Sequence, residues 1–303
     1  MGQARTIRKV SASKPTIEGA GVRLRRAFGF GDTHSTDPFL LLDDFRADDP
    51  RDYIAGFPWH PHRGIETITY MIEGTAEHRD SMGNHGTIGA GDAQWMTAGS
   101  GIIHEEMPRP GTSKRMGGFQ LWANLPRSHK MMDPRYRDIR NADVPVVRVG
   151  DGVSVRVICG EVKGVRGPVR DVVIEPEYLD VSLAAGARFD HATVPGHTVF
   201  TYVYEGKVSF CGQEDPYGYE AEGAGYMDMD RSPWVGHEHL AIFTDGDSLT
   251  ASAAADSHAR FLLISGKPLR EPVAWYGPIV MNTQEELRVA FDEYQKGTFI
   301  KKR

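Results

Sequence analysis

The sequence predicts an all-β protein built from two antiparallel barrels, with one helix near the C-terminus. Segments 65–72, 153–158 and 200–204 each alternate apolar and polar side chains and end at turn residues. Short strands at such regular spacing are typical of a sandwich or a barrel. The 34 glycines and 18 prolines among the 303 residues agree with this, because both residue types punctuate turns.

The two halves of the chain repeat one pattern, which favours two copies of a single barrel. Residues 67–74 and 200–206 both run along a strand into Glu-Gly, and each is followed by a further strand pair and a turn with Gly and Asp. A repeated unit is the economical explanation. We expect an N-terminal domain at 1–135 and a C-terminal domain at 136–303, with the boundary inside the polar stretch 127–150.

The one helix with clear start and stop signals spans residues 283–296. Thr283 and Glu286 have the spacing of a capping box, in which each side chain accepts a hydrogen bond from the other's backbone. Gly297 follows as a stop signal. The apolar stripe along this helix is interpreted as core contact.

Composition excludes several classes of protein. A formal charge of −6 argues against a nucleic-acid-binding surface as the main function. Two cysteines, Cys159 and Cys211, are too few for a disulfide framework, so a reducing compartment is expected. No apolar run approaches the ~18 residues that span a bilayer. We expect a soluble cytoplasmic protein, or a nuclear one if the source is eukaryotic. The short myristoylation pattern at Gly2 is common by chance and does not decide whether Gly2 is modified.

Two pairs of metal-ligating residues mark the N-terminal half. His60 and His62 point to the same face of a strand, since side chains alternate. With 12 histidines in the chain, one such pair is close to chance expectation. His104 and Glu106 form a second pair at the same spacing, 42 residues beyond His62. Neighbouring strands lie about 4.8 Å apart, so two such pairs on adjacent strands can meet at one point.

The chemistry of these four residues suits a transition metal. Three neutral imidazoles and one carboxylate are ligands that Fe, Mn, Cu, Ni and Zn accept. The competing interpretation is a set of ordinary polar residues in satisfied hydrogen bonds. A further pair, His237 and His239, has only His258 as a companion and no carboxylate at the same spacing, so a structural or surface role is favoured there.

The stretches around the four residues resemble the two cupin motifs of the pirin family. Residues 56–74, which contain His-Pro-His-Arg-Gly, look like the first motif as it occurs in pirins. Residues 91–108, which contain Gln-Trp-Met-Thr-Ala-Gly, resemble the second. Further segments similar to pirin are 37–45, 266–273 and 277–283, so the resemblance spans roughly residues 20 to 300.

The resemblance implies a bicupin with one metal ion in its N-terminal barrel. The implied ligands are His60, His62, His104 and Glu106. Fe(II) is the preferred metal, with Mn, Cu, Ni and Zn as alternatives. The second barrel is implied to have lost its metal ligands. General cupins take their carboxylate from the first motif, where Glu66 stands, whereas pirins resemble this chain in having a Glu two residues after the last His. Strand parity alone does not decide between the two carboxylates. Glu106 is chosen as the ligand, and Glu66 is assigned to the surroundings of the ligands, where it could orient a ligating imidazole.

The resemblance also implies an activity. Pirin-family proteins are associated with quercetin 2,3-dioxygenase activity, in which dioxygen opens a flavonol with loss of carbon monoxide. The metal would act on the flavonol oxygen as a Lewis acid, and Glu106, on loosening from the metal, would be the catalytic base that accepts the flavonol proton. Some pirins are partners of transcription factors or metabolic enzymes, so a regulatory protein with a protein partner is the alternative. A metal-dependent isomerase or sugar-binding cupin is a third.

The sequence does not identify the substrate-binding residues. Core packing is favoured over substrate contact for Trp95 and Met96. Other candidates for the wall or mouth of the pocket are Phe57, Gln94, Gln120, Trp122 and Asn124. The physiological substrate and the oligomeric state also stay open.

Overall fold

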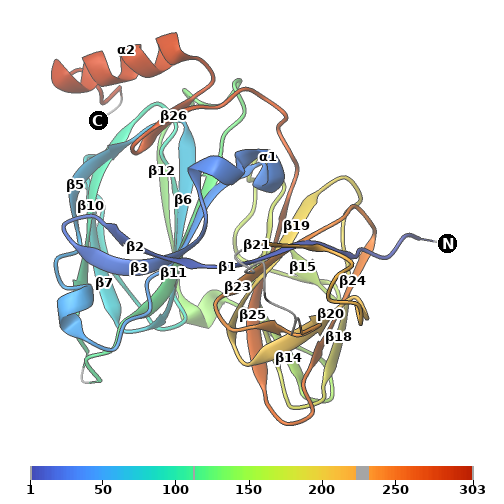
Figure 1. Ribbon diagram of the computed structural model, residues 1–303. Coiled ribbons are helices and arrows are strands. Elements are labelled where there is room, and N and C mark those ends of the chain that lie inside the picture. The colour runs from blue at the N-terminus through green and yellow to red at the C-terminus, as the bar shows by residue number, and fades with distance from the viewer. Residues whose placement is uncertain (1, 112, 223–231, 302–303) are drawn as a thin grey trace. The chain divides into compact units, whose positions relative to one another are not determined.

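The computed structural model describes residues 2–111, 113–222 and 232–301 and confirms the all-β prediction (Figure 1). The chain divides into two compact units. We call them the 38–143 unit and the 144–268 unit, after their longest segments. The 38–143 unit comprises Pro15–Thr33, Pro38–Asp143 and Leu269–Arg303, and the 144–268 unit comprises Met1–Lys14, His34–Asp37 and Val144–Pro268.

These units are not the continuous domains 1–135 and 136–303 expected from the sequence. The chain passes from the 38–143 unit to the 144–268 unit between Asp143 and Val144, inside the stretch 127–150 in which the boundary was expected. The two terminal segments are exchanged, however. β1 (Ile7–Ala12) pairs antiparallel with β23 (His239–Phe243), and residues 269–303 belong to the 38–143 unit. Pairing between segments so far apart in the chain leaves no local signal in the sequence.

The 144–268 unit consists of an eight-stranded sheet, a four-stranded sheet and a short hairpin. The large sheet has the strand order β13-β14-β17-β25-β19-β23-β1-β21, and the small sheet has the order β18-β24-β20-β22. The remaining bounds are α1 (Thr33–Thr36), β13 (Val146–Gly150), β14 (Val153–Cys159), β15 (Glu161–Val162), β16 (Val165–Arg166), β17 (Glu177–Leu183), β18 (Arg188–Ala192), β19 (Thr198–Glu205), β20 (Lys207–Phe210), β21 (Glu220–Glu222), β22 (Val235–Gly236), β24 (Ser248–Ala253) and β25 (Ala259–Gly266).

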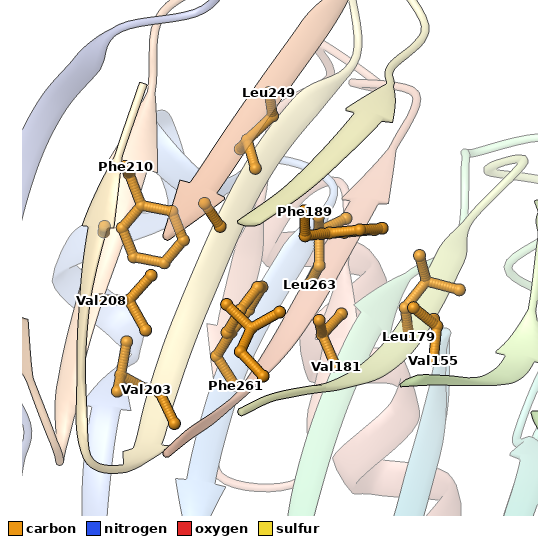
Figure 2. Close-up of a cluster of buried hydrophobic side chains, with 14 of the residues drawn as sticks. Val155, Leu179, Val181, Phe189, Val203, Val208, Phe210, Leu249, Phe261 and Leu263 are labelled. Atoms are coloured by element: carbon orange, nitrogen blue, oxygen red, sulfur yellow. The ribbon is translucent and has the colours of Figure 1, made fainter. Parts of the chain in front are cut away.

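The core of this unit lies between its two sheets (Figure 2). Val155, Leu179 and Phe261 come from the large sheet, and Phe189 and Phe210 come from the small one. Phe210 packs edge-on against Phe261, with ring centroids 5.4 Å apart. The buried residues of this cluster are apolar, as expected for a barrel filled by side chains.

The 38–143 unit is built from a seven-stranded sheet, a four-stranded sheet and a hairpin. The large sheet has the order β12-β9-β6-β11-β4-β3-β2, the small one has the order β5-β10-β7-β8, and β26 pairs with β27. The bounds are β2 (Lys14–Glu18), β3 (Val22–Phe28), β4 (Phe39–Asp44), β5 (Phe57–His62), β6 (Ile65–Glu73), β7 (Thr75–Asp80), β8 (His85–Gly89), β9 (Ala93–Thr97), β10 (Ile102–Arg109), β11 (Gly117–Asn124), β12 (Arg135–Ile139), β26 (Ala274–Tyr276) and β27 (Ile279–Met281).

The junction between β5 and β6 is held from inside by a lysine. Lys130 is 2% exposed, and its Nζ donates to Gly64 O at 3.0 Å, Asn124 Oδ1 at 2.7 Å and Val280 O at 2.9 Å. Gly64 has φ +78°, and a Cβ there would lie 2.0 Å from Val280 O. Only glycine therefore fits this bend, and Lys130 satisfies the carbonyls around it.

The C-terminal helix is confirmed as α2 (Gln284–Gln295). Thr283 Oγ1 accepts from Glu286 N at 3.1 Å, and Glu286 Oε2 accepts from Thr283 N at 2.9 Å, which is the expected capping box. Leu287 and Ala290 pack with Ile279 of β27 in one apolar cluster. In Figure 1, α2 is the red helix of this unit. Within the described part of the chain, no helix is long and apolar enough to cross a membrane.

The residues after α2 anchor the same junction. Arg63 is 2% exposed; its Nη2 donates to Phe299 O at 2.9 Å and its Nε donates to Ser100 O at 2.8 Å. Its Nη1 lies 2.8 Å from Glu293 Oε2, and its guanidinium stacks 4.2 Å from the Phe299 ring centroid. The C-terminal segment thus fixes the residue that follows His62.

Replacing Lys130 by Met should destabilise the 38–143 unit. The change removes the donor that Gly64 O, Asn124 Oδ1 and Val280 O share, although Gly64 O keeps a 3.3 Å hydrogen bond from Leu125 N. Each buried acceptor left unsatisfied costs roughly 1–3 kcal/mol. We expect a lower Tm by calorimetry. An unchanged Tm would contradict the anchoring role.

The stability lost in Lys130→Met should depend on pH in a predictable direction. Burial lowers the pKa of Lys130 to about 7, from its ordinary value of 10.5. Between these pH values the unfolded chain binds more protons at this residue than the folded chain, so the free energy of unfolding rises with pH. The stability difference between wild type and Lys130→Met should therefore widen from pH 7 towards pH 10. Denaturant titrations at several pH values measure this, and a constant difference would contradict the lowered pKa.

Candidate metal centre

The pairing of β5 with β10 brings three of the predicted ligands together. In this antiparallel pair His104 lies opposite His60, and Ile102 lies opposite His62. One ligating atom from each of His60, His62 and His104 lies within 4.8 Å of the others. The ring centroids are 4.3 to 4.9 Å apart. His62 and His104 are at most 1% exposed, and His60 is partly buried.

Hydrogen bonds to backbone carbonyls fix the tautomers of the first two histidines. His60 Nδ1 lies 2.8 Å from Pro58 O, and His62 Nδ1 lies 3.0 Å from Pro278 O. A carbonyl oxygen only accepts, so each Nδ1 carries the proton and, in a neutral ring, each Nε2 keeps a lone pair. The two Nε2 atoms are only 3.1 Å apart. Two lone pairs at this distance repel each other unless a proton or a cation lies between them.

The third histidine, His104, distinguishes a shared proton from a metal ion at this position. Burial lowers the pKa of His62 and of His104 well below its usual value, so both rings are neutral at pH 7. His104 Nε2 is buried and has no hydrogen-bond partner among the described residues. A single proton satisfies two nitrogens, whereas one metal ion can accept lone pairs from three. Two nitrogens bound at about 2.1 Å and at right angles lie about 3.0 Å apart, close to the 3.1 Å found here. The three imidazoles therefore fit a metal ion.

Glu106 lies beside this group without being part of it. It lines the same cavity as His60 and His62, and its Oε1 accepts a hydrogen bond from Thr69 Oγ1 at 3.0 Å. The compact group of ligating atoms found among the described residues contains the three histidines and not this carboxylate. The structure thus brings Glu106 to the site but leaves its ligand role a prediction.

Glu66 faces away from this side of the sheet. On β6, residues 66 and 69 project to opposite faces because side chains alternate. Thr69 bonds to Glu106, whereas Glu66 Oε1 accepts from Thr97 Oγ1 at 2.6 Å. Glu66 and His62 are an even number of residues apart, which would place them on the same face of one continuous strand. The bend at Gly64 separates β5 from β6, so the two side chains do not share a face. Burial raises the pKa of Glu66. Its hydrogen-bond partner is thus a threonine, not a ligating histidine.

The sequence reasoning missed His78 on β7. Its ring centroid lies 5.3 Å from that of His104 and 4.5 Å from that of Tyr136, on which it stacks. His78 Nδ1 lies 3.5 Å from His104 Nδ1, and His78 Nε2 lies 3.3 Å from Asp80 Oδ2. His78 and Asp80 have the same spacing of two that marked the other pairs, and this signal could have found them.

A cavity of about 570 Å³ opens onto His60 and His62. Trp122 meets His62 edge to face, with centroids 5.0 Å apart. Trp275 lies 6.0 Å from Trp122, and Phe30 lies 5.4 Å from Trp275. These rings, together with Phe45 and Phe57, give the cavity an aromatic lining.

Apart from the histidines, the ionisable side chains of the lining are three carboxylates and one arginine. Arg26 donates to both oxygens of Asp43 at 2.8 Å, and its Nη1 lies 2.9 Å from Glu18 Oε1. Burial raises the pKa of Asp43 to about 6, although Arg26 acts in the opposite direction. Gln120 and Glu106 also belong to the polar lining, beside His60 and His62. Because Arg26 is already paired with carboxylates, this cavity favours a neutral ligand that donates hydrogen bonds over an anionic one.

The remaining candidates divide between cavity and core. Phe57, Gln120 and Trp122 line the cavity. Trp95 and Met96 are at most 1% exposed and belong to the packed interior. Gln94 donates to Tyr136 Oη, and Asn124 accepts from Lys130.

Two of the candidate histidines of the 144–268 unit have other partners. His239 Nδ1 lies 2.8 Å from His237 O, and His258 Nε2 lies 3.1 Å from Glu205 Oε2. Across the described residues, the group that could hold a metal is that of the three histidines in the 38–143 unit.

Comparisons with known proteins cover both units. A family model described as Pirin matches residues 21–123, and one described as Pirin C-terminal cupin domain matches residues 178–300. A Pirin-like protein of Caulobacter vibrioides is 41% identical over 296 residues, covering 97% of this chain and 99% of the relative. PA3240 of Pseudomonas aeruginosa, named provisionally as a quercetin 2,3-dioxygenase, is 40% identical over 301 residues, covering 98% of this chain and 99% of its own.

A solved structure agrees with the fold. The crystal structure of quercetin 2,3-dioxygenase from Acinetobacter baumannii has a TM-score of 0.84 at 30% sequence identity, covering 98% of this chain and 99% of the other. With the two family models, it confirms the predicted architecture of two cupin-type barrels with a C-terminal helix.

Proposed function

The chain belongs to the pirin family, and from this premise we propose that it is a metal-dependent dioxygenase acting on flavonols such as quercetin. The observation that carries the proposal is the convergence of three imidazoles, two of which line an aromatic cavity and have Nε2 atoms 3.1 Å apart. The named activity of the Acinetobacter baumannii structure supports the same reaction.

The proposed ligands are His60, His62, His104 and Glu106, and the proposed metal is Fe(II). Imidazole and carboxylate ligands are compatible with Fe(II), and Mn, Cu, Ni and Zn are the alternatives. Four protein ligands leave one or two coordination positions for substrate, as a catalytic site needs. A bound divalent ion supplies Lewis-acid activation of the flavonol oxygen.

The cavity suits a flat, neutral polyphenol. Its volume of about 570 Å³ lies within the range of small-molecule pockets. The rings of Trp122, Trp275 and Phe30 offer stacking surfaces along its wall. The carboxylates of Glu18 and Asp43 can accept hydrogen bonds from phenolic hydroxyls, so flavonols should bind better than their sulfated derivatives.

Glu106 is the proposed catalytic base. Thr69 donates a hydrogen bond to Oε1 of this carboxylate, so Oε2 is the oxygen that would bind the metal and, on loosening from it, accept the flavonol proton. Trp122 and Phe57 help to exclude water from the place where that proton is transferred. The reaction then opens the flavonol with dioxygen and releases carbon monoxide.

The reaction itself can be tested directly. Quercetin is added anaerobically to the iron-loaded protein, and dioxygen is then admitted. Loss of the flavonol absorbance together with release of carbon monoxide supports the proposal. Tight binding of iron without turnover would contradict it and favour the regulatory alternative.

His62→Ala should abolish stoichiometric metal binding. The variant removes one of the three convergent imidazoles, whose Nδ1 is oriented by Pro278 O. Metal analysis of the purified protein measures the loss, and circular dichroism checks the fold. His239→Ala is the matched control, because it alters a His-x-His pair in the other unit and should leave metal content unchanged.

Glu106→Gln tests the base role in protein whose metal content is matched to that of the wild type. A base that transfers one proton contributes roughly 10²–10⁴-fold to the rate, so kcat should fall by that order. The iron content of the variant is measured in parallel. Undiminished turnover at full metal content would rule out the base role.

Trp122→Leu should weaken flavonol binding while metal is retained. Loss of an aromatic contact of about 0.5–1.5 kcal/mol corresponds to a roughly 2–10-fold higher Kd. Fluorescence quenching with quercetin measures this. Trp59→Leu is the control, because Trp59 is 51% exposed and does not line the cavity. Equal effects of both variants would contradict stacking on Trp122.

A further inference from the structure

Asp80 is a fixed hydrogen-bond acceptor behind the histidine cluster. Its Oδ1 accepts from the backbone N–H groups of Met82 at 2.9 Å and of Asn84 at 3.0 Å. Its Oδ2 accepts from Asn84 Nδ2 at 2.8 Å. Although burial acts in the opposite direction, hydrogen bonds from His78 and Asn84 lower the pKa of Asp80, so it is a carboxylate at neutral pH.

This carboxylate sets the tautomer of His78. Oδ2 of Asp80 lies 3.3 Å from His78 Nε2. A carboxylate only accepts hydrogen bonds, so Nε2 of His78 carries the proton and donates the hydrogen bond to Asp80. In the neutral ring, Nδ1 of His78 then holds a lone pair. The ring is 2% exposed and stacks on Tyr136 with an interplanar angle of 23°, which holds it in place.

His78 in turn sets the tautomer of His104. The two Nδ1 atoms are 3.5 Å apart, a long hydrogen bond in which one nitrogen must donate. Because Nδ1 of His78 has the lone pair, Nδ1 of His104 carries the proton. Nε2 of His104 is then unprotonated, and this is the buried atom that lacks a hydrogen-bond partner among the residues described.

We propose that Asp80 and His78 form a positioning relay that presents the Nε2 lone pair of His104 to the metal ion. The relay does for His104 what the carbonyls of Pro58 and Pro278 do for His60 and His62. It fills the orienting role that the sequence suggested for Glu66. This inference rests on the metal centre proposed above, but not on the flavonol reaction.

Two substitutions at His78 separate hydrogen bonding from packing. His78→Phe keeps a ring on Tyr136 but removes the acceptor for His104 Nδ1. His78→Asn removes the ring but can place its Oδ1 near the former Nδ1 position, where it accepts the same hydrogen bond. A relay predicts that Asn retains more metal affinity than Phe, whereas simple packing predicts the reverse.

The experiment is a Co(II) titration of the metal-free full-length protein, with a competing chelator to obtain Kd and the visible spectrum to report the ligand environment. Loss of an orienting partner typically weakens metal binding by about 10–100-fold, and we expect this for His78→Phe and Asp80→Asn. His78→Asn should stay within a few-fold of wild type. Thermal unfolding of the metal-free variants checks that each is folded.

Glu77→Gln is the matched control on the same strand, because Glu77 pairs with the exposed Arg109 and should not affect Kd. Wild-type Co(II) affinity in His78→Phe would overturn the relay, as would equal weakening by Phe and Asn in folded proteins. If His78→Phe fails to fold, the Kd values of Asp80→Asn and His78→Asn are compared instead.

The same experiments separate the relay from the proposed reaction. If the variants show the expected order of Co(II) affinities and flavonol is not consumed, the relay stands and the proposed reaction fails. A wild type that binds no Co(II) overturns the metal centre and the relay together.

Discussion

The antiparallel register between β5 and β10 is the constraint on which the candidate site depends. It places His104 opposite His60, so residues 44 positions apart in the chain share one point in space. Side chains in a strand alternate between two faces, and a slip of one residue would turn His104 away from His60. The bend at Gly64, which only glycine can make, ends β5 directly after His62 and lets β6 continue in the large sheet.

Burial gives this geometry its chemical meaning. Imidazoles taken out of water favour the neutral form, and a buried nitrogen lone pair without a donor costs free energy. His62 and His104 are buried with their Nδ1 atoms engaged and their Nε2 atoms left to one another and to His60. A cation removes this penalty. The folded unit therefore holds the three imidazoles in positions from which they can bind a metal ion.

The end of the chain is part of the same arrangement. Pro278 supplies the carbonyl that orients His62, Val280 supplies one acceptor for Lys130, and Phe299 packs on Arg63. Trp275 extends the aromatic wall of the cavity. The strand that carries His60 and His62 is consequently held by residues from the segment 269–303, which belongs to the same compact unit.

Much of the fold and of the site could be predicted from the sequence, because the signals are local. Alternation with a period of two predicted the strands, the Thr283–Glu286 box predicted the helix start, and paired spacing identified His60, His62 and His104 as ligand candidates. The motifs around those residues identified the family. Each of these signals lies within a few residues of the chain, and short-range geometry suffices to interpret it.

Only the tertiary structure decided what depends on contacts between distant segments. It placed the N-terminal segment in the 144–268 unit and the C-terminal segment in the 38–143 unit. Backbone pairing such as that of β1 with β23 does not depend on how far apart the two strands are in the sequence. It turned Glu66 towards Thr97, because the bend at Gly64 resets which face a residue occupies. It also placed His78 and Asp80 behind His104, a role that their own spacing could not reveal without the register of β7 on β10. The sequence alone determined which side chains could bind a metal, and the packing of strands decided which partners orient them.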